Sequence, residues 1–319
     1  MDTEIHRVGE MHHMPANETV LYIPFAIVVV LLLAIDLGVF NRRAHEVGLK
    51  EALIWSVVWT LVALVFNAGI FIYAGTTKAL EFFTGYVIER ALSFDNLFVF
   101  VIIFSYFGVP AKYHHRALFW GVVGALVTRA IFIAAGTALI SRFEWILYFF
   151  GVILIYSGWK MLREKDFEVH PDSNIFIRAA RKLFPVSDGY EAGKFFLRKE
   201  GLLYVTPLFL VLITVETTDI IFAVDSIPAV FGVTQDPFIV FTSNVFAILG
   251  LRASYFLLSG VMETFHYLSH GLSVVLIFIG VKMLVADVVH ISIGLSLAIV
   301  VAVLTIAVLA SLAKRRRGK

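Results

Sequence analysis

Long apolar stretches, each about the length of a membrane-spanning helix, recur along this chain of 319 residues. A transmembrane helix needs roughly 20 mostly apolar residues, because the hydrocarbon core of a bilayer is about 30 Å thick. A helix satisfies its own backbone polar groups in lipid, so each spanning stretch is expected to be helical. Nine stretches meet this length, at about 21–40, 52–74, 82–106, 117–140, 144–162, 202–226, 237–259, 271–286 and 291–312.

The composition strengthens this interpretation. Hydrophobic residues make up 60% of the chain, charged residues make up 16%, and the mean hydropathy is +0.88. A soluble protein of this length would need far more polar surface to cover its core. The predicted fold class is therefore all-α: a polytopic membrane helix bundle of nine transmembrane helices, with the excess apolar side chains facing the lipid bilayer.

Several classes of function are excluded by what the sequence lacks. The chain contains no cysteine, so disulfides, thiolate zinc sites and cysteine nucleophiles are ruled out. Its basic residues lie in short segments between the apolar stretches, which argues against binding to nucleic acid. We find no His-Glu-x-x-His motif, no Ser/His pairing within the spans and no nucleotide-binding loop, so we expect no enzyme. The polar first 20 residues are not expected to be a secretory signal.

Basic residues gather in alternate connecting segments and set the predicted orientation. With nine spans, the segments 41–50, 107–116 and 163–201 and the tail 314–319 all fall on one side of the membrane. The positive-inside rule makes that side cytoplasmic, with the N-terminus outside and the C-terminus in the cytoplasm. An even number of spans would put the tail or the early loops on the wrong side. The opposite side receives only Arg7, Lys78 and Arg142.

The segment 163–201 is the one sizeable loop between the predicted spans. Its mixed charges, together with Pro171, Pro185 and Gly189, are typical of a cytoplasmic linker between two halves. Two alternatives remain for its structure: an interfacial helix over 175–184, or a structureless regulatory loop.

The second half of the chain repeats the first at three places, in the same order. The offsets between the matching residues are 124, 123 and 122, so the register nearly holds over three spans. The matches are Phe107-Gly-Val109 with Phe231-Gly-Val233, Arg129 with Arg252, and Gly158-Trp-Lys-Met-Leu162 with Gly280-Val-Lys-Met-Leu284.

This repetition predicts two inverted units. Each unit holds three spans, 82–162 and 202–286, so the second must enter the membrane upside down relative to the first. Inverted repeats place a substrate site near the bilayer midplane, at their interface. Residues 20–81 and 287–319 would then be peripheral additions, the latter comprising the last helix and a basic tail.

Carboxylates occupy mirrored places in these two units. A charge at mid-bilayer costs about 2.5–3.5 kcal/mol even on lenient insertion scales, so five acids in apolar stretches cannot be incidental. Arginines 90, 129 and 252 are close enough in register to neutralise some of them. The structural alternative is that acids and arginines only pair to hold helices together, for instance Asp95 with Arg252. The five acids are Glu89, Asp95, Glu216, Asp219 and Asp225.

The chemistry around these acids points to a hard cation. Carboxylates that cluster in a low dielectric repel one another, so they take up protons or a metal ion. Oxygen ligands without cysteine or histidine suit Mg²⁺, Ca²⁺ or Mn²⁺ rather than Zn²⁺ or Cu⁺. The neighbouring polar residues all offer oxygen: Asn96, Thr217, Thr218, Ser226 and Asn244.

Helical geometry limits how these acids can act together. Glu89 and Asp95 are six residues apart, as are Asp219 and Asp225, which separates the members of each pair by roughly 9 Å along a straight helix. One possibility is that the helices break near 93–96 and 226–228, where Pro228 disfavours helix at the preceding residue. The other is that the acids form successive stations along a path.

Two motifs resemble those of the TerC family of membrane proteins, and within it the Alx-type bacterial members. They are Glu89-x3-Ser93-x-Asp95-Asn96 and Val215-Glu216-x2-Asp219-x2-Phe222-Ala-Val-Asp225-Ser226-Ile-Pro228. The segment Thr242-Ser-Asn244-x-Phe-Ala-Ile-Leu-Gly-Leu-Arg252 resembles the family too, and the similarity covers roughly residues 20–312.

The resemblance implies manganese export across the bacterial inner membrane by a LysE-like transporter, with Mn²⁺ as the substrate. By position, it assigns metal handling to six residues: Glu89, Asp95, Asn96, Glu216, Asp219 and Asp225.

Two hypotheses about function follow. The first is a secondary Mn²⁺ exporter in which the same acids take up protons as the coupling ion. The second is a membrane scaffold in tellurite or redox stress, which acts through protein partners recruited by the 163–201 loop.

Overall fold

The computed structural model describes residues 16–40, 48–163, 174–199, 201–259 and 267–317. The described chain forms two compact units, residues 1–44 and 45–319. The first unit contributes one described element, the apolar helix α1 (Ala16–Phe40), which contains the predicted span 21–40. The predicted external N-terminus and the basic cluster of loop 41–50 lie mainly outside the described residues.

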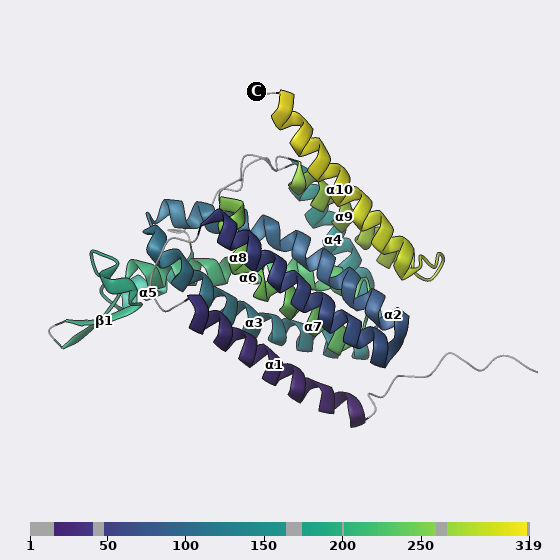
Figure 1. Ribbon diagram of the computed structural model, residues 1–319, viewed down its shortest axis with the longest axis horizontal. Coiled ribbons are helices and arrows are strands. Elements are labelled where there is room, and N and C mark those ends of the chain that lie inside the picture. Colours follow the sequence, from purple (N-terminus) through teal and green to yellow (C-terminus); the bar gives the residue numbers. More distant parts are fainter. Residues whose placement is uncertain (1–15, 41–47, 164–173, 200, 260–266, 318–319) are drawn as a thin grey trace, which may run out of the picture. The chain divides into compact units, whose positions relative to one another are not determined.

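The second unit is a helix bundle with a small antiparallel hairpin (Figure 1). The strands pair from Phe196 opposite Val205 to Lys199 opposite Leu202. The elements, in order, are α2 (Leu49–Tyr106), α3 (Ala111–Arg142), α4 (Ile146–Arg163), α5 (Ile175–Leu183), β1 (Phe196–Lys199), β2 (Leu202–Val205), α6 (Pro207–Phe231), α7 (Pro237–Leu249), α8 (Leu251–Ser259), α9 (Leu268–Leu284) and α10 (Ile293–Arg317).

Helix α2 is two helices joined at a glycine. Its 58 residues would extend roughly 87 Å at 1.5 Å per residue, far more than the thickness of a bilayer. Gly75 interrupts it with φ 84° and ψ 179°, a conformation that only glycine adopts without strain. The break falls between the predicted spans 52–74 and 82–106.

Length and apolar composition make five of the described helices able to cross a membrane, namely α2, α3, α4, α6 and α10. A sixth candidate is the pair α7 and α8, which is bent by 41° at Gly250. The described part of the chain is therefore that of a mainly helical, polytopic membrane protein, and its one small hairpin lies between α5 and α6. The finer count of nine spans remains a prediction.

The sixth predicted span begins too early. Residues 202–205 form strand β2, and helix α6 starts only at Pro207. Thr206 caps the helix, because its hydroxyl accepts a hydrogen bond from the amide of Phe209 at 3.4 Å. The helix then continues to Phe231, five residues beyond the predicted end at 226.

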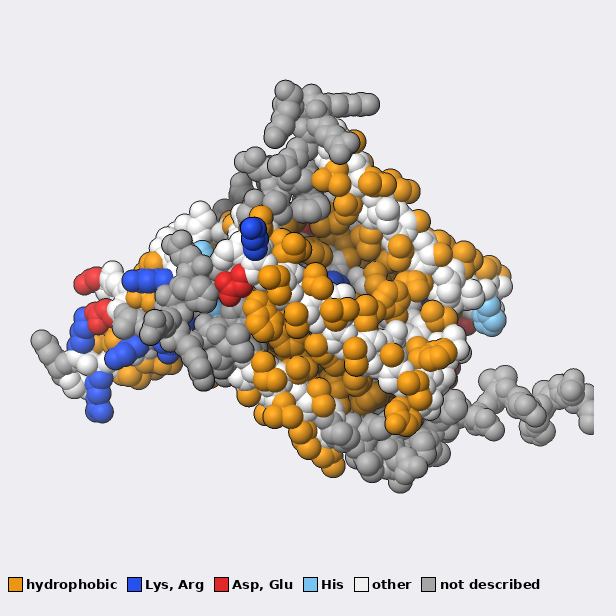
Figure 2. Space-filling view, in the orientation of Figure 1, with side chains coloured by type: hydrophobic (Ala, Val, Ile, Leu, Met, Phe, Trp, Pro, Cys, Tyr) orange, Lys and Arg blue, Asp and Glu red, His pale blue; other side chains and the backbone are white. Residues whose placement is uncertain are grey.

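The surface of the bundle is apolar where lipid is expected. Hydrophobic side chains cover much of the visible face of the helical body, whereas Lys, Arg, Asp and Glu gather around α5 and the hairpin (Figure 2). On α2, Val65 and Ile72 are 73% and 74% exposed. Exposed apolar surface of this extent is unfavourable in water and is suited to a bilayer.

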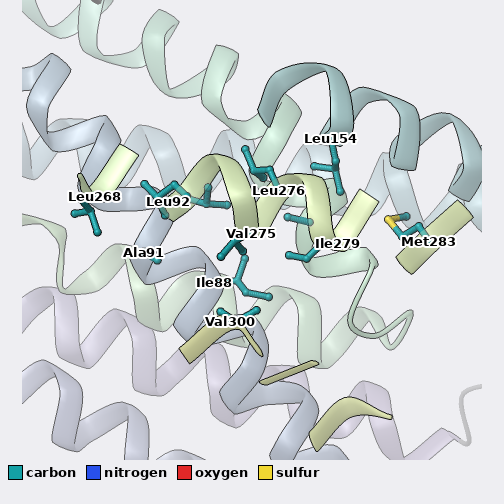
Figure 3. Packing of buried hydrophobic residues seen from close by; sticks show 12 residues of the cluster. Ile88, Ala91, Leu92, Leu154, Leu268, Val275, Leu276, Ile279, Met283 and Val300 are labelled. Atoms are coloured by element: carbon teal, nitrogen blue, oxygen red, sulfur yellow. The ribbon is translucent and has the colours of Figure 1, made fainter. Parts of the chain in front are cut away.

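Helix α9 contributes half of the buried residues of a large hydrophobic cluster in the described part of the bundle. Val275 lies among Ile88 of α2, Leu154 of α4 and Val300 of α10, and all four are almost fully buried (Figure 3). The prediction of a short span at 271–286 thus corresponds to a helix packed on several sides.

Helices α4 and α9 run antiparallel and touch at backbone distance. A Cβ atom built on Gly280 would lie 2.6 Å from the Gly151 carbonyl oxygen, and one on Gly151 would lie 3.0 Å from the Gly280 carbonyl oxygen. Further along, a Cβ on Gly158 would lie 2.7 Å from the carbonyl oxygen of Ser273. Small residues at these positions allow the close helix approach that stabilises membrane bundles.

The connecting segment 163–201 contains the predicted helix and an unpredicted hairpin strand. Helix α5 spans Ile175–Leu183, which favours the interfacial-helix alternative over a structureless loop. Its buried Ile177 packs against Val205 and Leu210. The Tyr190 hydroxyl donates a 2.6 Å hydrogen bond to the Phe107 carbonyl oxygen. Part of the segment, 164–173, lies outside the described residues.

Candidate functional site

Four helices bring five polar side chains together in the interior of the bundle. We call this group the central cluster: Glu89 from α2, Arg129 from α3, Asp219 and Ser226 from α6, and Asn244 from α7. Each of the five is at most 2% exposed. Burying a charge is costly unless it is paired. Such complete burial therefore requires that the charges of the cluster be neutralised by one another and by hydrogen bonds within the cluster.

The Arg129 guanidinium lies at the centre of this cluster. Its Nη1 atom donates a short hydrogen bond to the Glu89 carboxylate, and it also donates to Ser226 Oγ and Asn244 Oδ1, each at 3.0 Å. Its Nη2 atom donates to Asp219 Oδ1 at 3.2 Å. Asn244 closes the network by donating from Nδ2 to the other Glu89 oxygen at 3.0 Å. One guanidinium thus binds all four oxygen-bearing partners.

The pairing leaves hydrogen-bonding capacity unused. Two carboxylates face one guanidinium, so the cluster carries one negative charge in excess when both acids are ionised. Within the described residues, Asp219 Oδ2 and Arg129 Nε are buried without a hydrogen-bond partner. An unmet carboxylate oxygen in a buried site is costly, and it is the kind of atom that a cation would bind.

Small residues on neighbouring helices allow this convergence. Gly85 lies one turn before Glu89, and a Cβ atom there would come within 2.9 Å of Ser243 Oγ on α7. On α3, a Cβ at Gly124 would lie 2.0 Å from a carboxylate oxygen of Glu216. The absence of side chains at both glycines lets α7 and the Glu216 carboxylate approach closely.

Glu216 lies one turn from Asp219 but does not join the central cluster. It is partly buried against Gly124. Among the described residues, no side chain donates a hydrogen bond to its carboxylate. Glu216 thus has no cationic partner in the described part of the chain, although it lies close to a cluster that contains a guanidinium.

The other two predicted acids face different helices. Ser269 Oγ of α9 donates to Asp95 Oδ1 at 3.1 Å, and Ser157 Oγ of α4 donates to Asp225 Oδ1 at 2.6 Å. Asn96 is buried beside Asp95 and makes none of the bonds of the central cluster. The six predicted metal-handling residues therefore do not form one cage.

Of the two arrangements that the sequence left open for the acids, helix breaks are not found at these positions. Helix α2 is continuous through 93–96, and α6 is continuous through 226–228. Pro228 lies in the last turn of α6, where its missing N–H removes only one bond, that to the Val224 carbonyl. The remaining sequence alternative, acids as separate stations, is the one compatible with these straight helices.

No group of three or more His, Asp or Glu side chains in the described part of the chain is arranged to hold a metal ion. The oxygen donors nevertheless fit a hard cation in kind, since Glu89, Asp219, Asn244 and Ser226 offer carboxylate, amide and hydroxyl oxygens. A cation could use them together only if the guanidinium between them moved away.

A second arginine, which is partly buried, has a different environment. Arg90, next to Glu89 in sequence, donates to the Ala247 carbonyl at 3.0 Å and to Ser254 Oγ at 2.7 Å. It fills the bend between α7 and α8, where a Cβ on Gly250 would lie 2.3 Å from its Nη1 atom. Arg90 therefore satisfies backbone freed by the bend, rather than neutralising an acid as the sequence suggested.

Sequence reasoning did not identify Ser157 and Ser269, or the central position of Arg129. The serines were detectable as isolated hydroxyls in apolar stretches. Their pairing with Asp225 and Asp95, however, depends on which helices are neighbours, and a single sequence does not give that information.

Comparison with known proteins gives several matches over most of the chain. Residues 74–319 match the model of the integral membrane protein TerC family. An uncharacterized membrane protein of Myxococcus xanthus is 48% identical over 298 residues, 93% of each chain. The Alx proteins of Salmonella typhi and Escherichia coli K12 are 52% and 51% identical, over 88% of this chain and 90% of theirs. Both relatives carry a name that describes a membrane-bound redox modulator.

No solved structure matches this chain. The family match begins one residue before the Gly75 break, so it contains every residue of the central cluster and both acid–serine pairs. Together with relatives that are about half identical over nearly the whole length, this match shows that the chain belongs to the TerC family of integral membrane proteins.

Proposed function

We propose that this protein is a secondary transporter that exports a hard divalent cation, foremost Mn²⁺, from the cytoplasm through the central cluster. The observation that carries the proposal is the burial of Glu89 and Asp219 among four helices, with oxygens of Ser226 and Asn244 beside them. Acids at such depth are characteristic of ion pathways. The choice of Mn²⁺ over Mg²⁺ or Ca²⁺ rests on the resemblance to the family.

The proposed topology has nine spans, an external N-terminus and a cytoplasmic C-terminus in the bacterial inner membrane. It is supported when α2 is counted as two spans and α7 with α8 as one. Adding α1 and α9, whose apolar segments are shorter, gives nine among the described helices. Nine is also the number that places the basic segments on one side.

Contacts between α4 and α9 support the proposed inverted repeats. The sequence offset of 122 makes Gly158 equivalent to Gly280 and Gly151 equivalent to Ser273. A two-fold axis that exchanges the repeats must turn the contact of Gly151 with Gly280 into a contact of Ser273 with Gly158. Both contacts occur. The acid–serine pairs follow the same exchange of helices, since α2 pairs with α9 and α6 pairs with α4.

This arrangement suggests a staged path. In the proposed orientation, Asp95 lies six residues closer to the cytoplasm than Glu89, and Asp225 lies six residues closer to the outside than Asp219. The cation would pass from Asp95 to the central cluster and on to Asp225 as the repeats rock against each other. Protons taken up by the same acids are the proposed coupling ion for the return step.

Inverted membrane vesicles test this proposal, because export from the cytoplasm becomes accumulation inside them. We expect wild-type vesicles to accumulate Mn²⁺, and Asp219→Asn or Asp95→Asn vesicles to do so at least tenfold more slowly. Asp287→Asn is the matched control, since Asp287 is exposed beyond α9 and bonds Tyr148. Equal accumulation by wild type, Asp219→Asn and Asp95→Asn would overturn the site, and no accumulation above protein-free vesicles would overturn transport.

A second candidate function is a scaffold that acts on redox or tellurite stress through protein partners. It is favoured by the names of the Alx relatives and by the apolar surface of the connecting segment, where Ile175, Phe176 and Leu183 are more than half exposed. It predicts that stress resistance is lost when residues 174–199 are deleted and is kept when Asp219 is neutralised. Transport predicts the reverse for Asp219.

A further inference from the structure

We propose that Arg129 is a tethered substitute for the transported cation. Its guanidinium occupies the oxygen site while the carrier is empty, and an incoming divalent cation displaces it toward Glu216. This inference rests on the proposed function and adds to it a specific competitor built into the chain.

The position of the guanidinium is the first argument. Glu89, Asp219, Ser226 and Asn244 come from three helices, and each directs an oxygen atom at Arg129 of α3. A hard cation needs six to eight oxygens that converge in this way. The point on which the oxygens converge is already filled by a positive charge that belongs to the protein.

Charge is the second argument. One guanidinium leaves the two carboxylates with an excess negative charge, whereas a divalent cation in its place would match them. Both cations together would put three positive charges against two negative charges in a buried site, where repulsion between like charges is strong. Occupation by Arg129 and by the substrate is therefore mutually exclusive.

A place for the displaced guanidinium is the third argument. Glu216 lies three residues before Asp219, on the same face of α6, at the separation of about 5–6 Å that neighbouring helical side chains share. Its carboxylate accepts no hydrogen bond from the described residues and lies against Gly124 of α3, the helix that carries Arg129. Arg129 can thus exchange one carboxylate partner for another without leaving the protein interior.

An arginine that serves only as structural support would behave differently. Removing such a group would lower stability and leave Mn²⁺ binding unchanged or weaker. Removing a competitor makes Mn²⁺ binding tighter, because the ion no longer has to displace a bound charge. Binding affinity therefore separates the two roles, whereas loss of transport alone does not.

The test is Mn²⁺ titration of the purified full-length protein, with free Mn²⁺ followed by electron paramagnetic resonance. We expect Arg129→Gln to bind Mn²⁺ at least tenfold more tightly than wild type while transporting it more slowly. Arg129→Lys keeps a positive competitor and should remain within about threefold of wild type. Arg90→Gln is the matched control, since Arg90 bonds only neutral oxygens, and its affinity should not change.

A measurement on the wild type covers the case in which Arg129→Gln does not fold. Phenylglyoxal labelling, read by peptide mass spectrometry, should modify Arg129 faster when Mn²⁺ is bound, while Arg90 labels at an unchanged rate. Unchanged or slower labelling of Arg129 with Mn²⁺ bound would overturn the inference, as would equal or weaker Mn²⁺ binding by folded Arg129→Gln. A wild type that binds no Mn²⁺ would overturn the proposed function itself, and the inference with it.

Discussion

Arg90 and Arg129 both reach into the bundle, Arg90 partly buried and Arg129 only 1% exposed, and they bind opposite kinds of partner. Arg129 binds two carboxylates, an amide and a hydroxyl from neighbouring helices. Arg90 binds one backbone carbonyl and one serine hydroxyl at the bend between α7 and α8. The residue type is the same, and the charge of the partners is what most clearly separates the two arginines.

This difference indicates which arginine a cation can displace from its binding partners. A carbonyl and a hydroxyl at a helix bend would give a divalent ion no charge to balance. The two carboxylates that bind Arg129 offer a divalent ion that charge. They lose little interaction energy when the ion replaces the guanidinium, because they remain paired with a cation. We therefore attribute a structural role to Arg90 and a role in cation exchange to Arg129.

The largest effect is expected where a charged partner of Arg129 is removed. Glu89→Gln should lower Mn²⁺ affinity by about 100-fold, because losing one member of a buried charge pair costs about 3 kcal/mol and each 1.4 kcal/mol is tenfold. Mn²⁺ titration measures this loss. Glu81→Gln is the control, since Glu81 pairs with Lys78 at 3.1 Å outside the cluster. An equal loss of Mn²⁺ affinity in Glu81→Gln would contradict the special role of the acids that bind Arg129.

Crowding the second arginine should give the next largest effect, on stability alone. Gly250→Ala would place a Cβ atom 2.3 Å from Arg90 Nη1, so the guanidinium must shift away from the Ala247 carbonyl and Ser254, and losing these hydrogen bonds costs about 1–3 kcal/mol. The thermal unfolding temperature in detergent should fall. Gly294→Ala, where no atom lies within 4 Å of the new Cβ, should not lower it. A change in Mn²⁺ affinity for folded Gly250→Ala would argue against a purely structural Arg90.

Removal of Arg90 itself should be somewhat milder. Arg90→Gln leaves the buried Ala247 carbonyl without its donor, which costs about 1–2 kcal/mol. Unfolding followed by thermal or denaturant titration should show this loss, with the Mn²⁺ dissociation constant unchanged. Conversely, a dissociation constant that rises with this substitution would place Arg90 in the transport site.

The smallest effect is expected at the outer acid station. Ser157→Ala removes the hydroxyl that donates to Asp225 at 2.6 Å, and side-chain hydrogen bonds between membrane helices average about 0.6 kcal/mol. The Mn²⁺ transport rate in vesicles should change by about threefold. Ser141→Ala, whose exposed hydroxyl bonds only the Ala138 carbonyl, should leave the rate unchanged. A hundredfold loss for Ser157→Ala would mean that Asp225 belongs to the main binding site.

Much of the helical architecture was predictable because hydrophobic length is a strong signal in lipid. The hydrophobic pattern wrongly placed residues 202–206 in a helix. Leu202, Leu203 and Val205 lie in a strand, and a short apolar run does not distinguish a strand from a helix. The helix break near Pro228, one of the two alternatives for the acids, does not occur, because a proline in the last turn of a helix removes only one backbone hydrogen bond.

The candidate site was predictable in its residues but not in its grouping. Buried acids stand out in an apolar sequence at any position, so Glu89 and Asp219 could be found. Arg90 and Arg129 look alike in the sequence, since each is a single arginine in an apolar stretch, and Arg90, not Arg129, is the one that directly follows an acid. Which of them reaches the carboxylates depends on how α2, α3 and α6 pack, and no local pattern carries that information.

The most direct test of Mn²⁺ export through the central cluster is flux into proteoliposomes that contain only this protein. Wild type, the double variant Glu89→Gln/Asp219→Asn and the control Asp287→Asn would be compared under one imposed Mn²⁺ gradient. We predict rapid Mn²⁺ entry for wild type and Asp287→Asn, and entry no faster than in empty liposomes for the double variant. Equal entry for all three proteins, or none for wild type, would contradict the proposed transport through Glu89 and Asp219.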